Sequence, residues 1–180
     1  MSKILVLVGS ARRNGNTDIL AKSFATGARE NNEVEILYIS KYKIHPCKGC
    51  NACQKNELYQ CIQKDKMSII YGKLMLADIL IIASPVYFYG ISAQLKALID
   101  RLHNPLRNYF SIRKLGLILV GADVIPELFD SIIVQYELIL KFFGLQDVGR
   151  VLVRGAKNKG DVYKTEGIKE AYELGANIKS

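Results

Sequence analysis

The sequence predicts a doubly wound α/β fold, in which a five-stranded parallel sheet carries helices on both faces. Apolar runs of strand length alternate with amphipathic segments of helical length, which is the pattern of a parallel sheet with crossover helices. Three runs contain no polar residue, as expected for strands buried on both faces, and two alternate between polar and apolar residues. The alternating strands are second and fifth in the chain and belong at the edges, which gives the strand order 2-1-3-4-5.

The first half of the chain supplies three strands and two helices. Its first and third strands are unbroken apolar runs, whereas the second strand alternates. Asp65 stands directly before the second helix, where a carboxylate can cap the free N–H groups of the first turn. The strands are expected at residues 4–8, 33–38 and 79–83, and the helices at residues 18–31 and 66–76.

The second half of the chain continues the alternation of helix and strand. Gly144 follows a long apolar helix and is its expected C-terminal cap. The helices are expected at residues 92–102, 127–143 and 168–178, and the strands at residues 115–120 and 150–154. No internal repeat or long linker interrupts the sequence, so we expect residues 1–180 to form a single domain with a cysteine-rich loop at residues 44–61.

The composition indicates a globular, cytoplasmic protein. The formal net charge of +8 comes from scattered cations, without a basic run that includes aromatic residues, so we do not expect nucleic-acid binding. A positive field favours anionic cofactors such as pyridine nucleotides, although a solubilising surface explains the charge equally well. No apolar run approaches the roughly 18 residues of a membrane span, and the first run is too short for a secretory signal.

The loop after the first strand, residues 9–17, has the composition of a phosphate-binding loop. It reads Gly-Ser-Ala-Arg-Arg-Asn-Gly-Asn-Thr, which combines hydroxyl and amide donors with glycines that allow close backbone approach. The helix that follows begins with unpaired N–H groups and a partial positive charge, which attract anions. The loop matches neither the P-loop nor the dinucleotide fingerprint. An ordinary strand-to-helix turn rich in capping residues is the alternative.

A second unusual loop follows the third strand, at residues 84–90, and contains three aromatic residues. The carboxyl ends of the first and third strands meet at the switch point of the predicted sheet, so the two loops adjoin. A phosphate-binding loop beside an aromatic loop fits a mononucleotide with a planar head, namely FMN. FAD or tightly held NAD needs a second phosphate-binding loop, which the sequence lacks. A hydrophobic plug or a subunit contact also explains the aromatic residues.

Four stretches carry a family resemblance: residues 9–17, 46–53, 84–87 and 95–101. They resemble the NAD(P)H-dependent FMN reductase superfamily, and within it the branch of the iron-sulfur flavoproteins. The resemblance implies a flavodoxin-like fold, bound FMN, and electrons delivered by NAD(P)H as a transient donor or by ferredoxin. Relatives often carry a Gly-Gly loop after the fourth strand, where this chain has Gly-Ala-Asp at residues 121–123.

The resemblance also implies roles for residues in the two loops. No side chain is assigned as catalytic, because the flavin carries the chemistry. Asp100 and Arg101 end the helix after the aromatic loop and are expected in a surface or intersubunit ion pair. The implied phosphate ligands are Ser10, Arg12, Asn14, Asn16 and Thr17, and the residues implied to flank the isoalloxazine ring are Pro85, Val86, Tyr87, Phe88 and Gly90.

All four cysteines lie in the loop at residues 44–61, as Cys47, Cys50, Cys53 and Cys61. Three cysteines spaced by two residues with a fourth beyond them are close to the bacterial [4Fe–4S] run, and the same compact motif occurs in iron-sulfur flavoproteins. Structural zinc usually separates two pairs by a longer spacer. The four residues are therefore candidate cluster ligands. Free thiols, zinc and a redox disulfide are the alternatives, because FMN-only relatives carry a similar stretch.

These features favour an FMN-dependent oxidoreductase. Electrons pass from NAD(P)H or ferredoxin through FMN to a small acceptor such as a quinone, a nitro compound, a flavin or oxygen. The alternative is a flavodoxin-like electron carrier without small-molecule turnover, or a cofactor-free binding domain of the same fold. The helix at residues 127–143 is apolar on more than one face, which favours a homodimer or homotetramer unless that helix is covered within the monomer.

Overall fold

Five parallel strands form the central sheet of the structure, a computed structural model that describes residues 1–179. The strand order is β2-β1-β3-β5-β6, which confirms the predicted order 2-1-3-4-5 of the main strands. A sixth, two-residue strand, β4, pairs antiparallel with β3. The strands are β1 (Lys3–Val8), β2 (Glu33–Tyr38), β3 (Ile79–Tyr87), β4 (Gly90–Ile91), β5 (Lys114–Val120) and β6 (Gln146–Val153).

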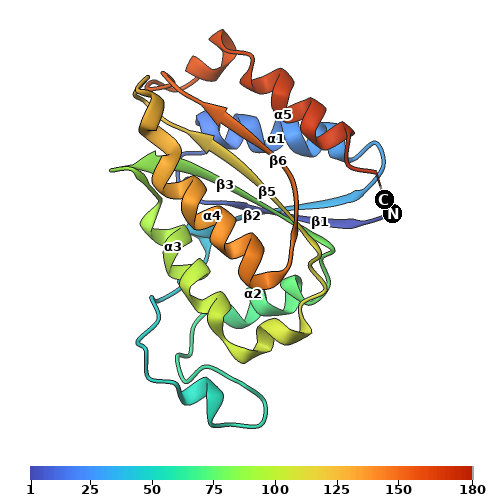
Figure 1. Ribbon diagram of the computed structural model, residues 1–180, viewed down its shortest axis with the longest axis vertical. Coiled ribbons are helices and arrows are strands. Elements are labelled where there is room, and N and C mark those ends of the chain that lie inside the picture. The colour runs from blue at the N-terminus through green and yellow to red at the C-terminus, as the bar shows by residue number, and fades with distance from the viewer. Residues whose placement is uncertain (180) are drawn as a thin grey trace.

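Helices cover both faces of the sheet, as predicted (Figure 1). Helices α1 (Asn16–Ala28) and α5 (Gly167–Ala176) lie on one face. Helices α2 (Met67–Leu74), α3 (Ala93–Ile99) and α4 (Asp130–Phe143) lie on the other face. None of these helices, in the part of the chain that the structure describes, is long and apolar enough to cross a membrane.

The central strands divide their side chains between two hydrophobic cores. Alternate residues of β1, such as Leu5 and Leu7, pack against α2, α3 and α4. The residues between them, such as Val6, pack against α1 and α5. Because both sets are buried, β1, β3 and β5 have no polar alternation, which is why they read as unbroken apolar runs. The edge strands β2 and β6 are only partly buried, as their alternation predicted.

Several predicted boundaries differ from those of the structure. Strand β3 continues to Tyr87, because the segment expected as a loop folds back and pairs with β4. Strand β6 begins at Gln146, four residues before the predicted start, with a register shift opposite Leu115 and Gly116. The helix expected at residues 92–102 ends its α-helical part at Ile99 and continues as a 3₁₀ helix, Asp100–His103.

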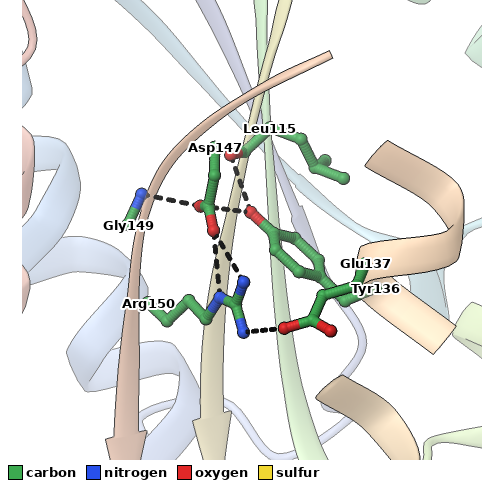
Figure 2. A network of polar contacts seen from close by, with 6 residues as sticks. All are labelled: Leu115, Tyr136, Glu137, Asp147, Gly149 and Arg150. Carbon is green, nitrogen blue, oxygen red and sulfur yellow. Dashed lines mark hydrogen bonds and ion pairs between the residues drawn. The ribbon is translucent and has the colours of Figure 1, made fainter. Parts of the chain in front are cut away.

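A polar network at the amino ends of β5 and β6 fastens helix α4 to the sheet (Figure 2). The Tyr136 hydroxyl lies 2.8 Å from the Leu115 carbonyl oxygen and 2.7 Å from the Asp147 carboxylate. Arg150 joins Asp147 to Glu137 through ion pairs of 2.9 and 3.0 Å. Burial and the hydrogen bond to Asp147 raise the pKa of Tyr136. The network lies at the end of the sheet opposite the loops predicted to bind the cofactor.

Candidate cofactor site

The loops after β1 and β3 lie side by side at the carboxyl end of the sheet. Val8 is the register partner of Ala83, and the Gly9 N–H donates to the Ala83 carbonyl at 2.8 Å. A side chain at Gly9 would place its Cβ 2.8 Å from Ser92 Oγ, at the N-terminus of α3. Gly9 therefore allows three elements to converge: β1, β3 and the start of α3.

The first turn of α1 is open to an anion. Gly15 is the N-cap residue, and no side chain in residues 1–179 caps the helix. The N–H groups of Asn16 and Thr17 have no intrahelical acceptor, as at every helix start, so they are available to an external ligand. Ser10 is buried beside this turn, and its hydroxyl oxygen accepts a hydrogen bond from the Arg12 N–H at 3.2 Å.

Asp18, in the same turn, fixes the conformation of the loop. Its buried carboxylate accepts hydrogen bonds from the Asn14 N–H at 2.6 Å and from the Tyr38 hydroxyl at 2.8 Å. Lys22 lies 3.1 Å from the same carboxylate and also donates to the Asn14 side chain. Asn14 has a φ of 54°, in the left-handed region, so these bonds hold a conformation that an L-residue seldom adopts.

The electrostatics of this turn favour an ionised Asp18 among cations. Burial opposes ionisation of the carboxyl group, but the bonds from Asn14, Tyr38 and Lys22 outweigh it and lower the pKa of Asp18. The Arg13 guanidinium stacks on the Tyr38 ring, 3.4 Å from its centroid. Sequence reasoning missed both Asp18 and Tyr38, because their roles depend on β2 lying beside the start of α1.

The implied phosphate ligands have different environments. Arg12 and Asn14 are exposed, whereas the side chains of Ser10 and Thr17 are buried against the protein. The Asn16 amide group bonds to the chain itself: it donates to the carbonyls of Ala156 and Asn158 and accepts from the Gly160 N–H. Asn16 thus ties the start of α1 to the segment after β6, and its backbone N–H is the group that remains for a ligand.

The aromatic segment after β3 is a hairpin with a two-residue turn. Tyr87 pairs with Gly90, and the turn residues Phe88 and Tyr89 have φ values of 47° and 62°. Two-residue hairpin turns of this kind normally use Asn and Gly, so a Phe-Tyr turn is strained. Phe88 is 98% exposed at the tip, and the Ser131 hydroxyl of α4 donates to the Tyr89 carbonyl.

The other implied ring contacts lie along the same hairpin. Pro85 pairs with Val120 in β5, and Val86 pairs with Ile91 in β4. Both are partly buried, and Tyr87 is 53% exposed. The hairpin therefore combines a fixed backbone with aromatic side chains that the rest of the chain does not cover.

The loop after β5, residues 121–124, leaves the same end of the sheet, because Val120 is the register partner of Pro85. A side chain at Gly121 would place its Cβ 2.3 Å from Leu128, so this glycine lets the segment before α4 pack over the end of β5. The carbonyls of Gly121 and Asp123 accept hydrogen bonds from the N–H groups of Ala156 and Gly155. This loop is thus joined to the same segment that Asn16 holds.

The cysteine loop projects beyond α2 and α3 as an extended segment with one short 3₁₀ turn, Ala52–Gln54 (Figure 1). All four cysteines are free thiols, with Cys47 and Cys50 exposed. The Gly49 N–H points to the Cys47 sulfur at 3.4 Å. Among residues 1–179, no three His, Cys, Asp or Glu side chains are close enough to hold a single metal ion. A [4Fe–4S] cluster has a different ligand requirement, because each cysteine binds a separate iron. Four thiols in one loop fit that donor set.

Comparison with known proteins identifies the family. The model of the NADPH-dependent FMN reductase family matches residues 2–146, which include the loops after β1, β3 and β5 and the cysteine loop. The chain belongs to the NADPH-dependent FMN reductase family. The match confirms the family that the sequence motifs predicted.

Two curated relatives are iron-sulfur flavoproteins. One, from Methanocaldococcus jannaschii, is 39% identical over 124 residues, which cover 67% of this chain and 63% of the relative. Another, from Archaeoglobus fulgidus, is 33% identical over an alignment of 184 positions, which covers 98% of this chain and 78% of the relative. The match thus spans less than two thirds of the first relative's own length.

A solved structure supports the fold. The NAD(P)H:quinone oxidoreductase from Methanothermobacter marburgensis superposes with a TM-score of 0.75 at 15% identity, over 98% of this chain and 96% of that chain. At this identity the likeness concerns the fold alone. It confirms the flavodoxin-like architecture that the sequence predicted.

Proposed function

We propose that this protein binds FMN at the carboxyl ends of β1 and β3 and passes electrons from NAD(P)H or ferredoxin to a small acceptor. The observation that carries the proposal is that an uncapped helix start and an exposed aromatic hairpin lie together at the carboxyl end of the sheet. The first feature suits a phosphate group, and the second suits a flat ring.

The residues of the loop divide the task of holding the phosphate. We assign the backbone N–H groups of Asn16 and Thr17 and the hydroxyl of Ser10 as donors to it, because they lie at the open start of α1. The cation of Arg12, exposed at the edge of the loop, adds attraction for the anion. Asn14 contributes through its fixed backbone rather than its side chain, which Lys22 already binds.

The hairpin would hold the isoalloxazine ring. Pro85 and Val86 are fixed by pairing with neighbouring strands, and Tyr87 and Phe88 offer exposed aromatic surface. Gly90 has open space where its Cβ would be, with only the Tyr87 carbonyl within 4 Å, so backbone can approach a ligand there. When bound, FMN supplies hydride and single-electron transfer, and the protein positions it and excludes competing reactions.

The first experiment measures FMN and its reduction. We expect protein purified under anaerobic conditions to carry flavin absorption bands, and NADH or NADPH to bleach them at a rate that supports turnover. A quinone, a nitro compound, free flavin and oxygen are then compared as acceptors. A protein that binds FMN but is not reduced by NAD(P)H would be an electron carrier, and a protein that takes up no FMN would contradict the proposal.

We also propose that Cys47, Cys50, Cys53 and Cys61 bind a [4Fe–4S] cluster that exchanges single electrons with the flavin. Four free thiols in one loop and the iron-sulfur flavoproteins among the relatives support this assignment. The Cys50→Ser variant should lose the broad absorption at about 400 nm together with iron and sulfide, while FMN remains bound. Unchanged iron and sulfide content in this variant would refute the assignment.

A second copy of the chain is the proposed partner of helix α4. Val134, Leu138 and Phe142 repeat at helical spacing and are 58%, 62% and 58% exposed, so the chain itself does not cover this stripe. We expect sedimentation to give a dimer or tetramer that Leu138→Glu dissociates. Leu76→Glu, at an equally exposed position after α2, is the matched control and should leave the assembly intact.

A further inference from the structure

Arg101 is a buried cation in the 3₁₀ helix that continues α3. Its side chain is 3% exposed and pairs with the Asp65 carboxylate, 2% exposed, at 2.5 Å. The neighbouring Asp100 instead pairs with Lys96 on the surface. The expected surface position of Asp100 is therefore correct, but for Arg101 it is wrong, because the fold brings Asp65 against the end of α3.

The ion pair joins both ends of the cysteine loop. The His45 N–H donates to the Asp65 carboxylate at 2.9 Å, and Arg101 donates to the His45 carbonyl at 3.1 Å. His45 precedes the first cysteine and Asp65 follows the last, so one backbone position and one side chain close the loop. A second link forms where the Asn104 amide donates to the Tyr59 carbonyl at 2.9 Å.

The guanidinium group of Arg101 also has an unused donor. Its Nε–H is buried and has no acceptor within residues 1–179. Arg101, Tyr71 and Cys61 line one cavity of about 500 Å³ under the cysteine loop. A buried donor without a partner destabilises a fold, and a buried ion pair contributes little to stability. Stability alone therefore does not explain this arrangement.

The same segment of chain reaches the predicted flavin site. Ser92 caps the start of α3 and packs on Gly9, between the phosphate loop and the aromatic hairpin. The other end of the segment carries Arg101 and Asn104, which hold the cysteine loop. One continuous stretch, residues 92–104, thus connects the flavin loops with the cysteine loop.

We propose that Arg101 is a positioning residue with two tasks. With Asp65 it fixes the ends of the cysteine loop against α3, and it places a positive charge at the wall of the cavity that Cys61 also lines. The second task rests on the proposed cluster, and the first does not. Hydrogen bonds and charge near cluster sulfurs set the reduction potential, and a cation favours the reduced, more negative form.

The test compares Arg101→Gln and Asp65→Asn, which remove opposite charges from one pair. Asp100→Asn removes an exposed carboxylate from the adjacent position and is the matched control. Trypsin, which can cut at the exposed Lys48 and Lys55, reports on the loop. We expect cleavage there to become about tenfold faster or more in both pair variants, because the loop opens locally, and to stay unchanged in the control.

The cluster potential separates positioning from a purely structural role. Arg101→Gln should shift it to a more negative value and Asp65→Asn to a more positive value, while Arg101→Lys, which keeps the charge, should return it toward wild type. Shifts of the same sign, or no shift, would overturn the second task. Unchanged tryptic cleavage would overturn the first task, which is to fix the ends of the cysteine loop.

Two controls allow the tryptic rates and the cluster potentials to be interpreted. Circular dichroism and FMN content establish that each variant is folded, and if Arg101→Gln does not fold, Asp65→Asn carries the tryptic and potential comparisons against Asp100→Asn. If the wild-type protein, loaded with iron and sulfide, forms no cluster, the proposed cluster and the second task of Arg101 both fail. The tryptic rates then still decide the first task, independently of FMN reduction.

Discussion

Replacing Asp18 by asparagine tests how the loop proposed to bind phosphate, residues 9–17, is held. The substitution keeps the shape of the side chain but removes the charge that accepts the Asn14 N–H at 2.6 Å. A hydrogen bond to a charged group contributes about 1.5–3 kcal/mol, and the pair with the partly exposed Lys22 adds less than about 1 kcal/mol. The Tyr38 hydroxyl can still donate to the remaining carbonyl oxygen. We therefore expect the free energy of unfolding to fall by about 2–3 kcal/mol.

Two effects on FMN binding then compete. Removing a negative charge near the phosphate favours binding by about 2 kcal/mol, at a separation of about 8 Å and the effective dielectric constant of about 20 that suits a buried carboxylate. Releasing Arg13 and Asn14 from their fixed conformation means that both must be ordered again on binding, at about 1–2 kcal/mol per residue. The second effect is larger, so FMN should bind about tenfold more weakly to the variant.

Urea unfolding of the FMN-free protein and titration of FMN fluorescence measure the two quantities. Lys22→Ala is the control, because it removes the exposed member of the ion pair and its bond to the Asn14 side chain but keeps the Asn14 N–H bond to Asp18, and it should change stability by less than about 1 kcal/mol. Repeating the titration at high salt screens part of the charge effect and should widen the difference between variant and wild type. Equal or tighter FMN binding by Asp18→Asn would refute this account of the loop.

Three further predictions concern the scaffold. Tyr136→Phe removes the hydroxyl bonds to the Asp147 carboxylate and the Leu115 carbonyl, while Arg150 still pairs with Asp147, and should lower stability by about 1–3 kcal/mol in urea unfolding, with unchanged FMN affinity because the network lies at the opposite end of the sheet. Gly27→Ala would place a Cβ 2.2 Å from the Tyr172 carbonyl where α1 and α5 cross, and should lower the melting temperature by several degrees. The pKa values of Asp18 and Asp147 are lowered from 3.8, so the unfolded chain binds more protons in acid. Stability should therefore be full above about pH 5 and fall below about pH 4, with a shallower fall in Asp18→Asn.

The order of the main strands was predictable because the burial of a strand determines the hydrophobic pattern of its own residues. A strand covered on both faces must be apolar at every position, and an edge strand alternates, so the pattern alone placed β2 and β6 at the edges. The loops after β1 and β3 were recognisable for the same reason: they follow directly on these strands. The strand order then brings the two loops together at the carboxyl end of the sheet.

Contacts between distant segments could not be predicted in this way, because no local pattern in the sequence indicates them. The hairpin of Tyr87 and Gly90 lacks the usual turn residues, so a strand pair was expected as a loop. The bonds from Asn16 to the segment after β6 involve residues more than a hundred positions away in the chain. Nothing near Asn16 in the sequence distinguishes a side chain that holds the protein from one that holds a ligand.

The family, the strand order and the positions of the two adjacent loops can be read from the sequence alone, because motif, hydrophobic pattern and chain order are local properties. Only the tertiary structure showed that Asp18, bonded to Tyr38, holds the loop at residues 9–17 through the Asn14 N–H, and that Arg101 closes the cysteine loop through Asp65. A buried carboxylate or guanidinium looks like any surface charge in the sequence. Its role is decided by which partner the packed fold brings within hydrogen-bonding distance after water is excluded.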